Sequence, residues 1–131
     1  MKTFINVLLE ECKKNIERTT GKEAANKDVK AELGRIFKVA GITKQNKYKI
    51  INGYKTQSYQ ISRRFAISLG LAFEFNVDEM NTFLAKAGHY LSEYHLADRI
   101  IVSFIKKGDF KITNIDEALY ENDLPLLAFR S

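Results

Sequence analysis

The chain has 131 residues, of which 45% are hydrophobic and 28% are charged, so it can build one compact domain with a buried core. Its single cysteine, Cys12, excludes an intramolecular disulfide and is typical of a reducing compartment. No apolar run approaches the ~20 residues of a membrane span. The start, Met1-Lys2-Thr3, leads into an amphipathic stretch rather than a signal peptide. We therefore expect a cytoplasmic protein without membrane contact.

The net charge of +5 hides a strong asymmetry along the chain. Residues 1–71 carry 15 basic and 6 acidic side chains, whereas residues 72–131 carry 6 and 10. No acidic residue occurs between Glu32 and Glu74, although this stretch holds eight basic ones: Arg35, Lys38, Lys44, Lys47, Lys49, Lys55, Arg63 and Arg64. Charges of one sign repel each other, so this acid-free basic stretch needs an explanation. It either attracts a polyanion or forms a solvated Lys-rich surface.

Helices are predicted throughout, because prolines and paired glycines are nearly absent and Pro125 lies close to the end. Apolar periodicity and cap residues give seven helices: Phe4–Arg18, Asp28–Val39, Lys44–Ile51, one after Ser58, Val77–Ala87, one from Ser92 to Gly108, and one from Asn114 to near Asn122. The expected N-caps are Asp28, Thr43, Ser58, Asn76 with Glu79, Ser92, and Asn114 with Glu117. Asn52-Gly53 is expected to end the third helix with a positive φ.

The strongest local pattern is a helix-turn-helix that begins at Gly41. Gly41 allows the left-handed turn, Ile42 supplies the buried residue after it, and Thr43 can cap the next helix. Lys44, Gln45 and Lys49 then share an outward face, whereas Ile50 points to the core.

These residue types suit double-stranded DNA. Lysine donates to guanine acceptors, and glutamine can pair with adenine. Free amides at a helix start and the Thr43 hydroxyl suit a phosphate, and Asn52, Lys55 and Thr56 could hold further phosphates. The predicted DNA-binding residues are Thr43, Lys44, Gln45, Asn46, Lys47, Lys49, Asn52, Lys55 and Thr56.

A family resemblance runs over about residues 28–127. Gly41 through Asn52-Gly53 is similar to the turn, recognition helix and following loop of the phage-repressor-like, Xre-type helix-turn-helix family. Later motifs also resemble this family or the helical extension of some Xre-like bacterial proteins: Leu69-Gly70-Leu71, 76–81, 84–88, 98–101, 107–108 and 115–119. The resemblance implies an all-α protein with a five-helix repressor-like domain, two further C-terminal helices, and operator DNA bound by a homodimer.

We accordingly expect a helix-turn-helix domain over residues 1–88 and a helical extension over residues 89–131 that packs on it. The protein would be a repressor-like transcription regulator that binds DNA sequence-specifically. A single short recognition helix buries little surface, so a homodimer is expected, with the sixth helix and Leu124–Phe129 as its candidate interface.

Two positions depart from the family pattern. The residue four before the turn glycine is usually alanine, and this chain has Phe37. The middle of the recognition helix usually carries a buried aliphatic residue, and this chain has Lys47, which must reach water or a phosphate. Either the two helices are splayed, with Tyr48 or Ile51 in the seam, or the module has lost its DNA-reading geometry.

The main alternative is a protein-interaction module of phage or mobile-element origin, such as an anti-CRISPR-like inhibitor of a host nucleic-acid enzyme. The acidic end of the chain could then face a basic partner through Asp109, Asp116, Glu117, Glu121 and Asp123. An enzyme is not expected, because no catalytic grouping stands out. The spacing of His89 and His95 suits no zinc motif, so neither a metal nor another cofactor is expected.

Overall fold

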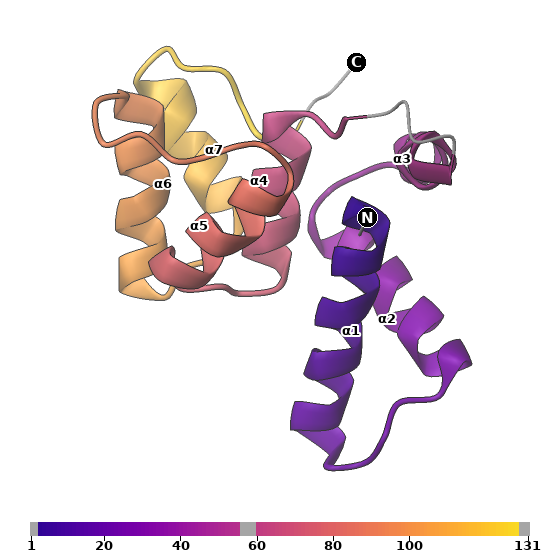
Figure 1. The fold of residues 1–131 in the computed structure, drawn as a ribbon. Helices are drawn as coiled ribbons and strands as arrows, with labels where there is room; N and C mark the ends of the chain where they lie inside the picture. The colour runs from indigo at the N-terminus through magenta and orange to yellow at the C-terminus, as the bar shows by residue number, and fades with distance from the viewer. Residues whose placement is uncertain (1–2, 56–59, 129–131) are drawn as a thin grey trace. The chain divides into compact units, whose positions relative to one another are not determined.

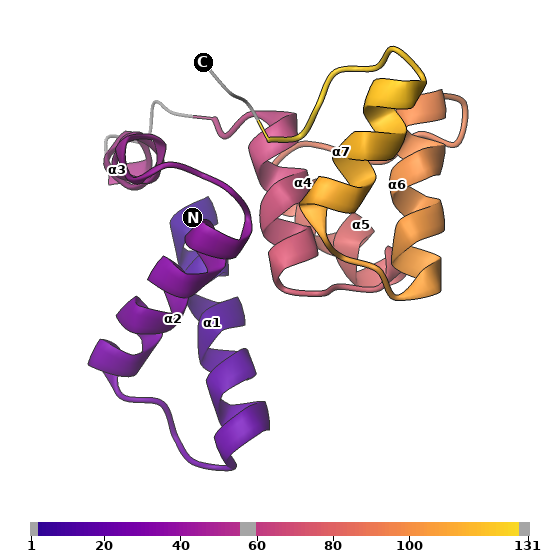
Figure 2. The ribbon, with the colours of Figure 1, turned by 180° about the vertical axis from the view of Figure 1, so that it is seen from behind.

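The computed structural model describes residues 3–55 and 60–128. Over these residues the chain forms seven helices and no strand, which confirms the all-α prediction (Figures 1 and 2). The helices are α1 (Phe4–Thr20), α2 (Asn26–Val39), α3 (Lys44–Lys55), α4 (Arg63–Ala72), α5 (Val77–Lys86), α6 (Leu96–Lys107) and α7 (Ile112–Glu121). None of these helices has the length and apolar character needed to cross a membrane.

The chain divides into two compact units, Met1–Gln60 and Ile61–Ser131. Helices α1 to α3 belong to the first unit and α4 to α7 to the second. The boundary expected after residue 88 falls inside the second unit, where α5 packs against both α4 and α6.

In the first unit, α1 and α2 form a helical hairpin with a shared apolar seam (Figure 1). Gly21 ends α1 with φ +71°, and the chain turns back toward α2. The fully buried side chains of the seam are Leu8, Cys12, Ile36 and Phe37. Helix α3 packs on α1, and both views show α3 almost end-on while α2 lies along the picture plane (Figures 1 and 2). The axes of α2 and α3 therefore cross at a steep angle.

The second unit is organised around α4, whose residues from Ala66 to Ala72 are all buried. Helix α5 packs closely on it at Gly70, where an added Cβ would lie 2.3 Å from Met80 Sδ. Larger side chains at position 70 would have to displace Met80, which is itself fully buried. Phe73 and Phe75 stack beside this contact, and the Phe83 ring meets both of them edge-on. Helices α6 and α7 complete the unit.

A buried carboxylate ties three segments of the second unit together. Asp98 on α6 is only 2% exposed. Its Oδ2 accepts a hydrogen bond from the Ser92 backbone N–H at 2.7 Å and forms an ion pair with Arg63 at the start of α4. Arg63 also donates to the Tyr90 carbonyl oxygen at 2.9 Å. The segment between α5 and α6 is thus fixed to α6 through the buried Asp98 carboxylate and to the start of α4 through Arg63.

Several predicted helix ends are confirmed. The Thr43 side chain caps α3, the Asn76–Glu79 capping box opens α5, and Gly88 and Gly108 follow α5 and α6 with positive φ. The predicted end of the seventh helix near Asn122 is also confirmed, because Asn122 is its C-cap.

Other predicted caps are wrong. Asp28 lies inside α2, which starts at Asn26 without a side-chain cap. Ser92 precedes α6 by four residues, and its backbone N–H donates to the Asp98 carboxylate. Asn114 lies inside α7 and donates to Asp109, so it forms no capping box with Glu117. Ser58 lies outside the described residues, and Ser62 caps α4 by accepting from the Phe65 backbone N–H.

The sixth helix is less buried than its apolar composition predicts. Leu96 is 44% exposed, and Ile100, Val102 and Phe104 are half-buried. Only Asp98, Ile101 and Ile105 are buried along α6. One side of this helix is therefore covered by the second unit, and the other side keeps apolar groups at the surface.

Burial controls the chemistry of Cys12. Loss of solvation raises the pKa of its thiol from 9.0 to about 12. We expect no reaction of the native chain with a thiol reagent near neutral pH, and full reaction after denaturation in urea.

The unfolded thiol ionises near 9 and the native one near 12. Its contribution to the free energy of unfolding is thus present below pH 9 and is lost as the pH rises toward 12. A Cys12→Ala variant lacks this part of the pH dependence, and rapid labelling of the native protein would contradict the burial.

The Asp98 network gives a second expectation. Replacing Asp98 by alanine leaves Arg63 without its ion-pair partner and the Ser92 N–H without its acceptor. We expect a loss of about 2–4 kcal/mol in the free energy of unfolding, measured by urea denaturation. Glu117→Ala, at an exposed position of α7, is the matched control and should change stability by less than about 0.5 kcal/mol. Equal small losses in both variants would show that the network is not a stabilising one.

Candidate nucleic-acid interface

The turn before α3 has the predicted geometry. Gly41 adopts φ +73°, which favours glycine, and the Ile42 side chain after it is buried. The Thr43 hydroxyl accepts a hydrogen bond from the Asn46 backbone N–H at 3.2 Å, and the Thr43 carbonyl accepts one from the Lys47 N–H at 2.9 Å. This cap leaves the backbone N–H groups of Lys44 and Gln45 without a partner among the described residues. They are donors that an anion at the helix start could use.

The side chains of α3 divide between an outer and an inner face. Lys44, Gln45 and Lys49 are exposed, and Ile50 is fully buried, as the sequence predicts. Asn46, Lys47 and Asn52 are half-buried, so they lie at the borders of the exposed face.

Helix α3 is longer than predicted. Asn52-Gly53 does not end it; both residues are helical, and the helix continues to Lys55. A glycine inside a helix costs only about 1 kcal/mol relative to alanine, which the surrounding turns can offset. With 3.6 residues per turn, Lys44, Asn52 and Lys55 fall on one side of the helix. The side chain of Lys55 and all of Thr56 lie outside the described residues.

The seam between α2 and α3 is partly open. Phe37 is 1% exposed, and Tyr48 is 71% exposed, so Tyr48 does not fill the seam. A pocket of about 340 Å³ lies between the end of α2 and the start of α3. Lys47 crosses it, and a Cβ added at Gly34 would lie 3.5 Å from the Lys47 Nζ. Lys47 is half-buried, which agrees with the requirement that its charge keeps contact with water.

Two residues at this surface were missed in the sequence. Lys38, on the last turn of α2, lines the same pocket as Lys44 and Lys47, so three lysines surround the start of α3. Tyr48 lies on the outer face between Lys44 and Asn52. Lys38 was overlooked because it precedes the turn. Tyr48 follows Lys44 by four residues, and this spacing indicates in the sequence that the two side chains share one face of the helix.

The acidic residue nearest before this surface is already engaged. Glu32 accepts hydrogen bonds from Arg35 at 3.0 Å and from Asn15 at 3.2 Å. The hydrogen bond from Arg35 holds the pKa of the Glu32 carboxyl below its usual value. No acidic residue occurs in α3 itself. The lysines around its N-terminus therefore lack a neighbouring carboxylate in sequence, and the positive end of the helix dipole adds to their repulsion.

The other basic residues of the acid-free stretch have local roles in the second unit. Arg63 is committed to Asp98 and Tyr90, and the Arg64 guanidinium lies 5.0 Å from the centre of the Phe65 ring. Arg63 therefore stabilises the fold of the second unit.

The acidic end of the chain is only partly available to a partner. The Asp116 carboxylate accepts hydrogen bonds from the Leu127 and Ala128 backbone N–H groups. Asn114 donates to Asp109, and this hydrogen bond lowers the Asp109 pKa. The remaining acids of this set, Glu117, Glu121 and Asp123, are exposed. In the expected dimer segment, Leu127 is buried, Leu126 is 37% exposed, and Phe129 lies outside the described residues.

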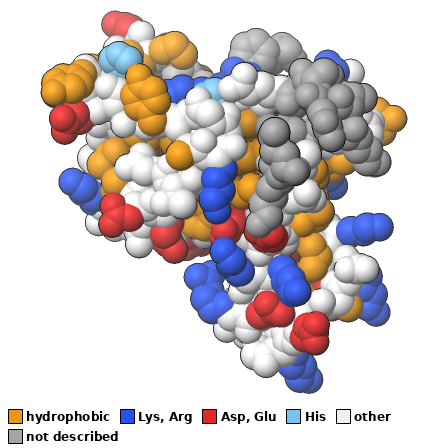
Figure 3. All heavy atoms as spheres, viewed as in Figure 1, with side chains coloured by type: hydrophobic (Ala, Val, Ile, Leu, Met, Phe, Trp, Pro, Cys, Tyr) orange, Lys and Arg blue, Asp and Glu red, His pale blue; other side chains and the backbone are white. Residues whose placement is uncertain are grey.

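Exposed apolar side chains occur in the second unit as well. Tyr90, Tyr94 and Leu96 are 69%, 86% and 44% exposed. Figure 3 shows hydrophobic side chains gathered beside a histidine on this unit, and a mixture of basic and acidic ones on the unit that contains α1 and α2. His89 is turned toward the protein, with its Nε2 2.8 Å from the Ile61 carbonyl oxygen. Within the described ranges no three His, Cys, Asp or Glu side chains are grouped as a metal site.

Comparisons with protein-family models, with curated proteins and with solved structures give no match to this chain. The proposed function therefore depends on the geometry of α3 and its surroundings.

The Thr43 cap is testable by one substitution. Thr43→Ala removes the acceptor of the Asn46 N–H, and we expect the free energy of unfolding to fall by about 1 kcal/mol in urea denaturation. Thr113→Ala, at an exposed position of α7, removes a hydroxyl of the same kind and should have a smaller effect. A Thr43 variant as stable as its control would contradict the capping role.

Proposed function

We propose that the protein binds double-stranded DNA through α3 and regulates transcription as a non-enzymatic, repressor-like factor. The observation that carries the proposal is the group of three lysines, Lys38, Lys44 and Lys47, around the capped start of α3. Repulsion among three ammonium groups at the positive end of a helix is unfavourable unless an anion joins them. Two unpartnered backbone N–H groups at the same place suit a phosphate.

The outer face of α3 supplies groups that read bases. The side chains of Gln45 and Lys49 are exposed on α3, where a helix placed in the major groove meets base edges. The steep crossing of α2 and α3 supports this arrangement, because it lets α3 enter the groove while α2 lies across the backbone (Figures 1 and 2). We propose that Thr43, Asn46 and Asn52 assist at the borders of this face.

A second candidate function is a protein-interaction module that inhibits a nucleic-acid enzyme. The open seam under Lys47 and the buried Phe37 at the tight position of the turn favour it, because both separate α2 from α3. Such a surface could hold an anionic group of a partner protein instead of a phosphate.

Salt dependence separates the two functions. The DNA proposal predicts duplex binding that weakens steeply with salt, because each phosphate contact releases counterions. Lys44→Ala with Lys49→Ala should lower affinity at least about tenfold, and loss of the Lys44 phosphate contact should reduce the slope of log affinity against log salt by about 1. Binding is measured by fluorescence anisotropy of a labelled duplex.

The matched control is Lys22→Ala with Lys27→Ala, which removes the same charge from exposed positions outside α3. This control should keep nearly all of the wild-type affinity. Equal losses in the two double variants would indicate a diffuse charge effect, and no duplex binding at low salt would favour the inhibitor. Selection from random duplex DNA should enrich a palindrome if a homodimer reads two half-sites.

A further inference from the structure

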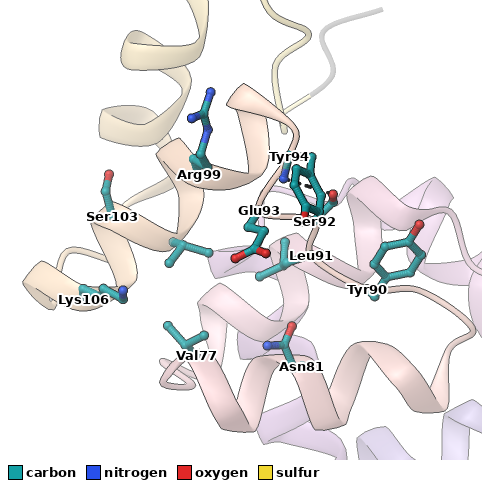
Figure 4. Close-up of a pocket in the computed structure, with 11 residues that line it drawn as sticks. Val77, Asn81, Tyr90, Leu91, Ser92, Glu93, Tyr94, Arg99, Ser103 and Lys106 are labelled. Carbon is teal, nitrogen blue, oxygen red and sulfur yellow. Dashed lines mark hydrogen bonds between the residues drawn. The ribbon is translucent and has the colours of Figure 1, made fainter.

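A second surface, independent of α3, lies between α5 and α6 (Figure 4). It is a groove of about 820 Å³, within the usual range of ligand-binding cavities. The segment between the two helices closes it with two highly exposed tyrosines, Tyr90 and Tyr94. We call this surface the α5–α6 groove.

The floor and one wall of the α5–α6 groove differ in chemistry. Val77, Leu91 and Val102 are half-buried and form apolar parts of its lining. Along α6, Arg99 and Lys106 follow each other at a spacing of seven residues, which places them about 10 Å apart on the same side of the helix. Figure 4 shows these two cations at opposite ends of the α6 side.

Two other basic groups of this unit are engaged in local contacts. Arg63 is paired with Asp98, and the Lys107 ammonium lies 4.4 Å from the centre of the Phe104 ring. Arg99 and Lys106 have no partner among the described residues, although residues 61–131 carry ten acids against eight basic residues. Two unpaired cations beside an apolar groove are complementary to a ligand that is both acidic and apolar.

We propose that the α5–α6 groove binds an acidic, apolar peptide segment of a partner protein. An apolar side chain of that segment lies on the groove floor, and its carboxylates pair with Arg99 and Lys106. A nucleic acid fits less well, because it carries a phosphate at every nucleotide, whereas the groove offers two cations, apolar side chains and one carboxylate, that of Glu93.

The test uses the full chain as the target and selects its ligands from a display library of random dodecapeptides. We expect enriched peptides that carry two carboxylates around an aromatic or aliphatic residue. The double charge reversal Arg99→Glu with Lys106→Glu should weaken binding of the enriched peptide at least about tenfold, measured by fluorescence anisotropy. The control reversal, Lys86→Glu with Lys111→Glu, changes exposed cations outside the groove and should leave the affinity unchanged.

Circular dichroism confirms that each variant is folded, and Tyr94→Ala, at an exposed position, provides a second variant that keeps every charge. It should also weaken binding. An enriched consensus without acidic residues, or equal losses in the two charge reversals, would overturn the proposal. Binding of labelled oligothymidylate that is lost only in the groove variant would assign the groove to nucleic acid instead. Self-association lost in that variant would assign it to a second copy.

Discussion

The buried carboxylate of Asp98 is the constraint on which the second unit depends. It holds Arg63 at the start of α4 and the Ser92 N–H before α6, so one charge fixes the path of the chain from α5 to α6. A buried carboxylate is unfavourable unless it is fully hydrogen-bonded, and here its partners come from the start of α4, 35 residues earlier in the sequence, and from the segment just before α6. The same network holds the groove wall at two points, the Tyr90 carbonyl through Arg63 and the Ser92 N–H through Asp98.

The first unit differs, because it carries an excess of positive charge that its own acidic side chains do not neutralise. Residues 1–60 carry 13 basic and 6 acidic side chains, and the acid nearest before α3, Glu32, is occupied by Arg35 and Asn15. The lysines at the start of α3 therefore keep a field that a polyanion can neutralise. The two units thus differ in the sign of their net charge, which is consistent with separate ligands for their two surfaces.

Local sequence rules, such as apolar periodicity and cap chemistry, predicted most of the local structure. The all-α class, the Gly41 turn, the Thr43 cap and the burial of Ile42 and Ile50 follow from periodicity and cap chemistry. The predictions for Ser92 and Asn114 failed because α6 begins four residues after Ser92 and α7 begins two residues before Asn114. Neither the Arg63–Asp98 pair nor the lysine pocket at Lys38 could be predicted, since both join residues by tertiary packing.

The placement of the tyrosines has a spectroscopic consequence. The chain has six tyrosines and no tryptophan, so its near-ultraviolet emission comes from tyrosine alone. The four tyrosines whose side chains the structure describes are all highly exposed: Tyr48 on the outer face of α3, Tyr90 and Tyr94 beside the α5–α6 groove, and Tyr120 on α7. Each surface thus carries its own intrinsic chromophore. A set of single Tyr→Phe replacements would turn the unlabelled protein into a reporter that tells which surface a ligand has covered.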